Sequence, residues 1–353
     1  MSARVAGCRL GTHRVIDPVG TLPQAAWRLD NTPIPRSNEI LCAVDVLNID
    51  SASFKQIAEA CGHDPQAVAE HIAATVAERG KQHNAVTGSG GMFVGRVLEI
   101  GSDLAARNDI AVGDRIASLV SLTLTPLLVE TIQAVDVTTG RVWVEGRAIL
   151  FESSLYARLP EDIPFDVALA VLDVAGAPAQ VRRLAQPGQH VCVIGADGKS
   201  GLLSCAAARR QVGASGRVVG IVLDAGTAAA QLLVEHGYAD TLVEADARDA
   251  LAVVAALGTR LPDLADLVVN CVNVPGTELA SILAARDEGI VYFFSMSTSF
   301  TAAALGAEGV AKDVTMIVGN GYAKGHAATA IATLRECPPI LAYFTQRYAL
   351  RPV

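Results

Sequence analysis

The most constraining feature of this sequence is a regular alternation of apolar runs and Ala-rich helical patterns that begins near residue 163. Short linkers separate these segments, as expected for a compact repeating αβ arrangement. Parallel strands need a crossover between them, usually a helix, so the alternation predicts a doubly wound parallel sheet. The predicted strands cover residues 190–195, 217–224, 239–246, 265–273, 290–297 and 314–322. The predicted helices cover residues 162–185, 202–213, 225–238, 247–258, 277–289 and 327–337.

The first 150 residues have a different pattern, with short apolar runs separated by Pro, Gly and Asn. Runs 39–49 and 91–101 predict strands, and AVGDRIASLV predicts a turn followed by a strand. The exception is residues 54–81, which predict a helix broken at Gly62–Pro65. A β-rich domain therefore precedes the αβ domain.

Composition narrows the class of protein. The chain has 353 residues, of which 51% are hydrophobic and 18% charged, so it can bury a large core. The net charge of −8 and the lack of a basic run argue against nucleic acid or an anionic membrane as partner. Seven cysteines without a C-x-x-C pair argue against a four-cysteine zinc site. The N-terminus shows no apolar signal core, which predicts a cytoplasmic protein.

The segment VCVIGADGKSGLL carries the sharpest local motif. An apolar strand runs into Gly195, Gly198 and Gly201, and a helix follows. Glycines at such a turn allow tight geometry, close approach of a pyrophosphate and close strand–helix packing. Lys199 and Ser200 add a cation and a hydroxyl at the N-terminus of the helix, which itself favours anions. The spacing is G-x-x-G-x-x-G, and an ordinary βαβ turn without ligand is the alternative.

The strand after this turn ends in Asp224. An acidic residue about 20 positions after the glycine motif hydrogen-bonds the ribose of NAD. No Arg or Lys occurs in the following AGTAAAQ to bind a 2′-phosphate, so NAD is favoured and NADP remains possible. The ligand crevice of such sheets lies at the carboxyl ends of the strands. The predicted nicotinamide contacts are therefore Cys271, Val272, Ser295 and Met296.

The order of domains and four motifs together resemble the medium-chain dehydrogenase/reductase superfamily. The motifs are VTGSGGMFVGRVLEIG, AVGDRIA, LPEDIPFDVALAVLD and MIVGNGYAKGHA. The resemblance implies a GroES-like β-rich catalytic domain over residues 1–160, completed by 316–353, and a Rossmann NAD-binding domain over 161–315. It also implies a homodimer formed through edge strands of the Rossmann sheet, which we expect around IVYFFSMS.

Within the superfamily, three segments are similar to amine dehydrogenases of lysine fermentation that act on a 3,5-diamino acid. These segments are GTHRVIDPVGTLPQAAWRLDN, HNAVTGSGGMFVGRV and GADGKSG. The resemblance implies hydride transfer from C3 to NAD(P), hydrolysis of the iminium and release of ammonia. Two alternatives remain open: a zinc-free quinone or enoyl reductase, and a catalytically silent NAD-binding protein.

Asn48 and Ser89 stand where the resemblance places the Cys and His that bind zinc in the zinc-dependent members. Neither side chain suits zinc, which takes thiolate, imidazole or carboxylate. We therefore predict no catalytic metal, and one tightly bound zinc per purified chain would contradict this.

A substrate with two ammonium groups favours carboxylates at the site, because a carboxylate orients an ammonium and takes part in proton transfer. Asp173 is the first candidate, since an Asp among Ala, Val and Leu needs a partner, although a helix-capping or interdomain hydrogen bond would also explain it. Asp50 is the second, although an N-cap would equally explain it. His83 and Ser89 complete the predicted catalytic set. Weaker candidates for the carboxylate or ammonium groups are Ser51, Ser53, Glu130, Glu145, Lys324 and His326.

Overall fold

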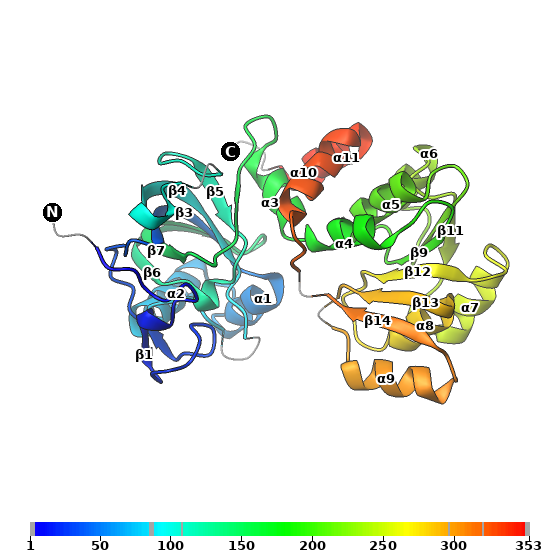
Figure 1. Ribbon diagram of the computed structural model, residues 1–353, viewed down its shortest axis with the longest axis horizontal. Coiled ribbons are helices and arrows are strands. Elements are labelled where there is room, and N and C mark those ends of the chain that lie inside the picture. The colour runs from blue at the N-terminus through cyan, green and yellow to red at the C-terminus, as the bar shows by residue number, and fades with distance from the viewer. Residues whose placement is uncertain (1–3, 85–87, 107–108, 296, 320, 350–353) are drawn as a thin grey trace. The chain divides into compact units, whose positions relative to one another are not determined.

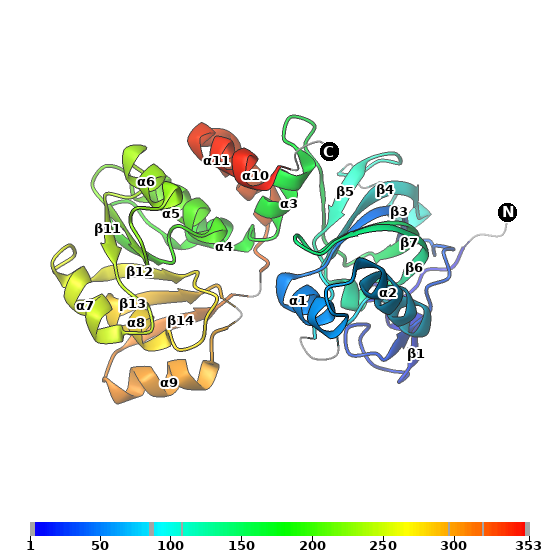
Figure 2. The same ribbon diagram turned by 180° about the vertical axis from the view of Figure 1, so that it is seen from behind.

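The computed structural model describes residues 4–84, 88–106, 109–295, 297–319 and 321–349. The chain divides into two compact units, Met1–Leu159 and Pro160–Val353. The alternation of strands and helices that begins near residue 163 lies in the second unit. Each unit has its own sheet, and Figures 1 and 2 show both from opposite sides.

The first unit is built on a six-stranded antiparallel sheet in the order β6-β7-β3-β4-β5-β8. Its strands are β1 Val15–Asp17, β2 Arg28–Leu29, β3 Glu39–Asn48, β4 Met92–Ile100, β5 Arg115–Ser118, β6 Leu127–Asp136, β7 Arg141–Phe151 and β8 Tyr156–Arg158. Its helices are η1 Thr12–Arg14, α1 Ser51–Ala60, α2 Pro65–Arg79, η2 Ser102–Leu104 and η3 Leu122–Leu124. The predicted helix with its break is therefore α1 followed by α2.

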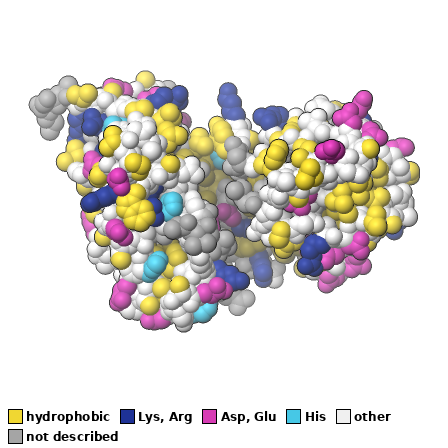
Figure 3. Space-filling view, turned by 90° about the horizontal axis from the view of Figure 1, so that it is seen from below, with side chains coloured by type: hydrophobic (Ala, Val, Ile, Leu, Met, Phe, Trp, Pro, Cys, Tyr) yellow, Lys and Arg dark blue, Asp and Glu magenta, His cyan; other side chains and the backbone are white. Residues whose placement is uncertain are grey.

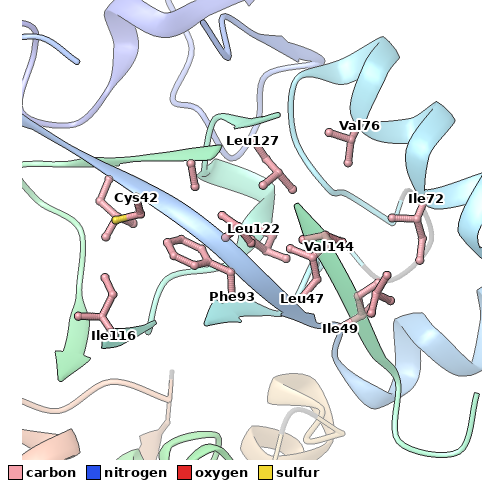
Figure 4. Close-up of a cluster of buried hydrophobic side chains, with 14 of the residues drawn as sticks. Cys42, Leu47, Ile49, Ile72, Val76, Phe93, Ile116, Leu122, Leu127 and Val144 are labelled. Atoms are coloured by element: carbon pink, nitrogen blue, oxygen red, sulfur yellow. The ribbon is translucent and has the colours of Figure 1, made fainter. Parts of the chain in front are cut away.

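The core of this unit lies between the sheet and α2. Figure 4 shows Leu47 of β3, Phe93 of β4 and Val144 of β7 facing the same interior as Ile72 and Val76 of α2. All five side chains are buried. Ile72 and Val76 lie four residues apart, which places them on one face of α2 and explains why this helix packs on the sheet.

The second unit contains a parallel sheet in the order β11-β10-β9-β12-β13-β14. This order reverses between β9 and β12, as in a dinucleotide-binding sheet. Its strands are β9 His190–Ile194, β10 Arg217–Val222, β11 Thr241–Glu244, β12 Ala265–Asn270, β13 Ala285–Phe293 and β14 Val314–Val318. Its helices are α3 Phe165–Leu172, α4 Gly176–Leu184, α5 Lys199–Val212, α6 Ala228–Glu235, α7 Ala250–Gly258, α8 Glu278–Ala284, α9 Phe300–Gly309, α10 His326–Glu336 and α11 Pro338–Tyr348.

Two expectations about this unit need correction, and two of its helices were missed. The segment IVYFFSMS begins within β13, which ends at Phe293 and has neighbours on both sides, so β14 and not β13 is an edge strand. The helix predicted over 277–289 ends at Ala284, because Ala285 already pairs with Ala265 of β12. Helices α9 and α11 were not predicted. Their signals are the N-cap Ser299, whose side chain accepts from Ala302 N, and prolines at the start of α11.

The C-terminal helices α10 and α11 group with the second unit and contact helices α3 to α6. The loop before α10 comes close to α4. A Cβ on Gly176, the first residue of α4, would lie 2.4 Å from Gly321 O, so glycine permits this approach. That residues 316–353 complete the N-terminal domain therefore stays a prediction.

Candidate active site

The turn between β9 and α5 rests directly on β10. Gly195 adopts a φ of 76° and donates its N–H to Ile221 O, and Ala196 donates to the same carbonyl. A Cβ on Gly220 of β10 would lie 2.8 Å from the Ala196 Cβ. The turn thus needs Gly195 for its left-handed backbone and Gly220 for space beneath it.

The other two glycines of the motif, Gly198 and Gly201, differ in whether the protein's own packing requires a glycine there. A Cβ on Gly201 would lie 2.1 Å from Gly195 O, so only glycine lets the helix pack against the turn. A Cβ on Gly198 would meet nothing closer than Gly195 O at 3.5 Å, so the protein itself does not require glycine there. Gly198 is the N-cap of α5 and has no capping side chain, so the first-turn N–H groups face this space. A pyrophosphate fits this cradle.

Asp173 lies at the C-cap of α3 and forms an ion pair with Lys199, the first residue of α5 (Oδ2–Nζ 2.7 Å). Both side chains are about one third exposed or more, 40% for Asp173 and 32% for Lys199. The sequence predicted that Asp173 needs a partner, and the structure identifies this partner as the Lys199 ammonium. The pair joins a predicted amine-binding residue to the glycine turn.

Acidic side chains gather where β10 and β11 end. Asp224 is exposed, and its Oδ1 accepts from Gly226 N at 2.7 Å. Glu244, the last residue of β11, accepts from Ala225 N at 3.0 Å. Asp224 follows β10 by two residues, and β10 is the neighbour of β9, so Asp224 comes after the strand next to the glycine turn, as its predicted ribose contact requires.

At the carboxyl ends of β12 and β13, buried Asn270 shapes the loop. Its Nδ2 donates to Thr277 Oγ1 and Ser281 Oγ at 2.8 Å each, and its Oδ1 accepts from Val272 N. Cys271 N donates to Ile194 O of β9. Burial raises the pKa of the Cys271 thiol to about 11, which keeps the thiol neutral and argues against a nucleophile.

The other predicted nicotinamide contacts lie in the same region. Ser295 Oγ donates to Asn273 Oδ1 at 3.5 Å, and Ser297 Oγ donates to it at 2.9 Å. Val272 Cγ2 would lie 2.8 Å from a Cβ on Gly195, which puts it beside the turn. Met296 lies outside the described residues. The carboxyl ends of β9, β10, β12 and β13 thus bring the predicted cofactor residues to one edge of the sheet.

In the first unit, the segment around Gly90 packs against the start of α1. A Cβ on Gly91 would lie 2.8 Å from Asp50 N, and one on Gly90 would lie 2.4 Å from Gln82 O. Asn84 Nδ2 donates to Ser53 O at 3.3 Å, and Asn84 N donates to Ser89 O at 2.9 Å. These contacts bring the predicted residues Asp50, His83 and Ser89 into one neighbourhood.

Asp50 is the N-cap of α1, which is the alternative to a catalytic role that the sequence left open. Its Oδ1 accepts from Ser53 N at 3.0 Å, whereas its Oδ2 is buried and has no hydrogen-bond partner among the described residues. The same holds for His83 Nδ1. Burial, with the charges of Arg79 and Lys81, lowers the pKa of His83 to about 4, so the imidazole is neutral at physiological pH.

Sequence reasoning missed Lys81, Gln56 and Gln82. Lys81 is fully buried, and its Nζ donates to Pro23 O and Gln24 O. Burial, with the charge of Arg79, lowers the pKa of Lys81 to about 8. Gln56 and Gln82 each bury a partnerless Oε1 within the described part of the chain. Their only sequence signal is proximity to Asp50 and His83.

Of the weaker candidates, Ser51 and Ser53 belong to the first turn of α1, next to Asp50, and the other four lie on other elements. Glu130 lies on β6 and pairs with Arg147, and Glu145 lies on β7 and accepts from Gln133. Lys324 is exposed. His326 is buried against Tyr322, and burial lowers its pKa.

No group of three His, Cys, Asp or Glu side chains within the described ranges has the arrangement of a metal site. Asn48 ends β3 and pairs with Met92 of β4. The prediction of a metal-free site therefore still awaits metal analysis. In the part of the chain that the structure describes, no helix is both long and apolar enough to cross a bilayer.

Solved structures share this fold at low sequence identity. A mycobacterial protein solved with NADPH is 18% identical, with a TM-score of 0.53 over 91% of this chain and 84% of that chain. A quinone oxidoreductase from Coxiella burnetii is 15% identical, with a TM-score of 0.52 over 86% and 82% of the two chains. The predicted fold, with an antiparallel β-rich unit followed by a Rossmann unit, is confirmed.

Sequence relatives are much more similar. The family model of the L-erythro-3,5-diaminohexanoate dehydrogenase N-terminal domain matches residues 13–160. Two curated proteins named L-erythro-3,5-diaminohexanoate dehydrogenase, from Acetoanaerobium sticklandii and Fusobacterium nucleatum subsp. nucleatum, are each 50% identical over 343 residues. The match covers 97% of this chain and 99% of each relative. This chain therefore belongs to the L-erythro-3,5-diaminohexanoate dehydrogenase family.

Proposed function

We propose that this protein catalyses the NAD-dependent oxidative deamination of L-erythro-3,5-diaminohexanoate to 5-amino-3-oxohexanoate and ammonia, a step of lysine degradation. The observation that carries this proposal is 50% identity over almost the whole chain with two enzymes of that name. The glycine cradle supports the nicotinamide cofactor, which accepts hydride from C3 when bound. Water then replaces nitrogen at C3, and one ammonium and one proton leave.

The direct test measures NADH formation and ammonia release from the diamino acid. We expect equal amounts of both products, with a rate that rises with pH, because the C3 ammonium must lose a proton before hydride departs. Oxidation of NADPH by quinones, without turnover of the diamino acid, would instead support the quinone reductase alternative. Absence of both reactions, with NAD still bound, would support the catalytically silent alternative.

We assign the cofactor to the second unit through Gly195, Gly198 and Gly201, with the first turn of α5 and Lys199 at the pyrophosphate. Asp173 then holds Lys199 at that position through the 2.7 Å ion pair. Replacing Asp173 with Asn should raise the KM for NAD severalfold with little change in kcat. A large fall in kcat at saturating NAD would show instead that Asp173 acts on the amine, as the sequence suggested.

The choice of NAD over NADP is assigned to Asp224. A carboxylate at the end of β10 hydrogen-bonds the ribose hydroxyls of NAD and repels a 2′-phosphate. We expect Asp224→Ala to lower kcat/KM for NAD about tenfold or more while that for NADP stays equal or rises. Asp246→Ala is a matched control, because Asp246 follows β11 by two residues, as Asp224 follows β10. Equal losses with both cofactors would contradict the ribose contact.

The protein is proposed to be a homodimer assembled through β14. This strand is an edge of the sheet, and Val318 is 61% exposed on it. Phe300 and Leu305 of the adjoining α9 are also exposed, and Figure 3 shows hydrophobic side chains at the surface of this unit. Exposed edges and apolar patches mark association surfaces. Light scattering should give twice the chain mass, and Val318→Lys should give a monomer; a monomeric wild type would contradict this.

A further inference from the structure

Unpartnered acceptor atoms concentrate around the start of α1. Within the described residues, Asp50 Oδ2, Gln56 Oε1 and Gln82 Oε1 are buried and accept no hydrogen bond. Gln82 is only 1% exposed. A buried polar atom without a partner costs about 1–3 kcal/mol, and native proteins leave few of them. Three such oxygens near one helix therefore require an explanation.

The contacts already described bring together the two segments that carry these residues. Asp50 and Gln56 belong to the N-cap and second turn of α1, and Gln56 follows Ser53 by one turn on the same face. Asn84, two residues after Gln82, donates to the Ser53 carbonyl. Two of the three oxygens thus come from α1 and its N-cap. The third comes from the segment 82–84, which contacts α1.

The chemistry of the atoms defines what would satisfy them. All three are acceptors, and one of them belongs to a carboxylate, so the missing partner is a multiple N–H donor with positive charge. An ammonium group has three N–H donors and one positive charge, and charged hydrogen bonds of this type are strong. Water supplies two donors and no charge.

We infer that Asp50, Gln56 and Gln82 bind the C5 ammonium of the diamino acid and thereby select a diamino acid over a monoamino acid. This inference rests on the proposed function. The C3 ammonium must give up a proton during the reaction, whereas the C5 ammonium keeps its charge from substrate to product. A buried carboxylate with two amide oxygens stabilises the group that stays charged.

The test compares two substrates that differ only at C5: L-erythro-3,5-diaminohexanoate and 3-aminohexanoate of the same C3 configuration. Gln82→Met keeps the side-chain length and removes the acceptor. We expect it to lower kcat/KM for the diamino acid about ten- to hundredfold and to leave that for 3-aminohexanoate within about twofold. Gln56→Met should act in the same direction.

Two matched controls come from α2. Gln66→Met removes an exposed glutamine that hydrogen-bonds Glu70, and should change neither substrate. Asp64 caps α2 as Asp50 caps α1, so Asp64→Asn controls for lost capping in Asp50→Asn. Unchanged melting temperature and NAD affinity verify that each variant folds.

Equal losses with both substrates would overturn the inference, since they would place the acceptors at C3 or in general folding. Unchanged diamino acid kinetics would overturn it as well. If wild type fails to oxidise the diamino acid, the proposed function fails separately. Calorimetry then decides the inference: Gln82→Met should bind 3,5-diaminohexanoate at least tenfold more weakly, and equal affinity would reject the acceptor site.

Discussion

Glu39→Gln is expected to lower the free energy of unfolding by about 3–5 kcal/mol, because it removes the buried carboxylate that pairs with the buried Arg14 guanidinium. Glu39 is 1% exposed and Arg14 is 3% exposed. The carboxylate accepts from Arg14 Nη2 at 2.6 Å and Nε at 3.0 Å, and from His13 Nε2 at 2.8 Å. Urea denaturation measures the loss. Glu59→Gln, which breaks only an exposed pair with Lys55, should change stability by less than about 0.5 kcal/mol.

The pH dependence of the protein's stability is a second measure of the role of Glu39. Burial favours the neutral acid, but hydrogen bonds from His13 and Arg14 outweigh it and lower the pKa of Glu39 to about 2. A carboxyl whose pKa is lower in the folded state stabilises the protein at neutral pH, and this stabilisation is lost as pH falls from about 4.5 to about 2. The loss amounts to about 3 kcal/mol and should be absent in Glu39→Gln. An identical acid dependence in both proteins would contradict the assignment.

Gly198→Ala is expected to weaken NAD binding more than tenfold while the fold stays intact. The new methyl group would meet nothing closer than 3.5 Å, and the φ of −77° suits alanine. It would fill the space through which the backbone approaches the pyrophosphate. We expect stability within about 1 kcal/mol of wild type, measured by urea denaturation, and a raised Kd for NAD, measured by calorimetry.

Gly201→Ala separates packing from binding. Its methyl group would lie 2.1 Å from Gly195 O and 2.6 Å from Ala196 O, so the backbone must shift. This variant should lose both stability and NAD affinity. Gly198→Ala binding NAD as tightly as wild type would show that no phosphate group approaches this turn.

Much of the fold was predictable because its determinants are local. Each signal comes from residues that are close in sequence: the 3.6-residue and two-residue periodicities, the glycine turn and the break at Gly62–Pro65. The errors occurred where tertiary pairing overrides local preference. Residues 285–289 have a helical composition, but Ala285 pairs with β12, so the chain becomes a strand there. Helix α9 lies between two strands with a weak apolar pattern, and only the Ser299 cap signals its start.

By itself, the sequence determined the order of the two units, the parallel sheet, the glycine cradle and the relationship to a diamino acid dehydrogenase family. Only the tertiary structure decided which distant side chains meet. It paired Asp173 with Lys199 and buried Arg14 against Glu39. It also brought to one helix the segments of Asp50 and Gln82, whose Oδ2 and Oε1 atoms accept no hydrogen bond from the described residues. The physical reason is that periodicity reports what each segment buries, whereas charge pairing and hydrogen bonding depend on which segments fold against each other.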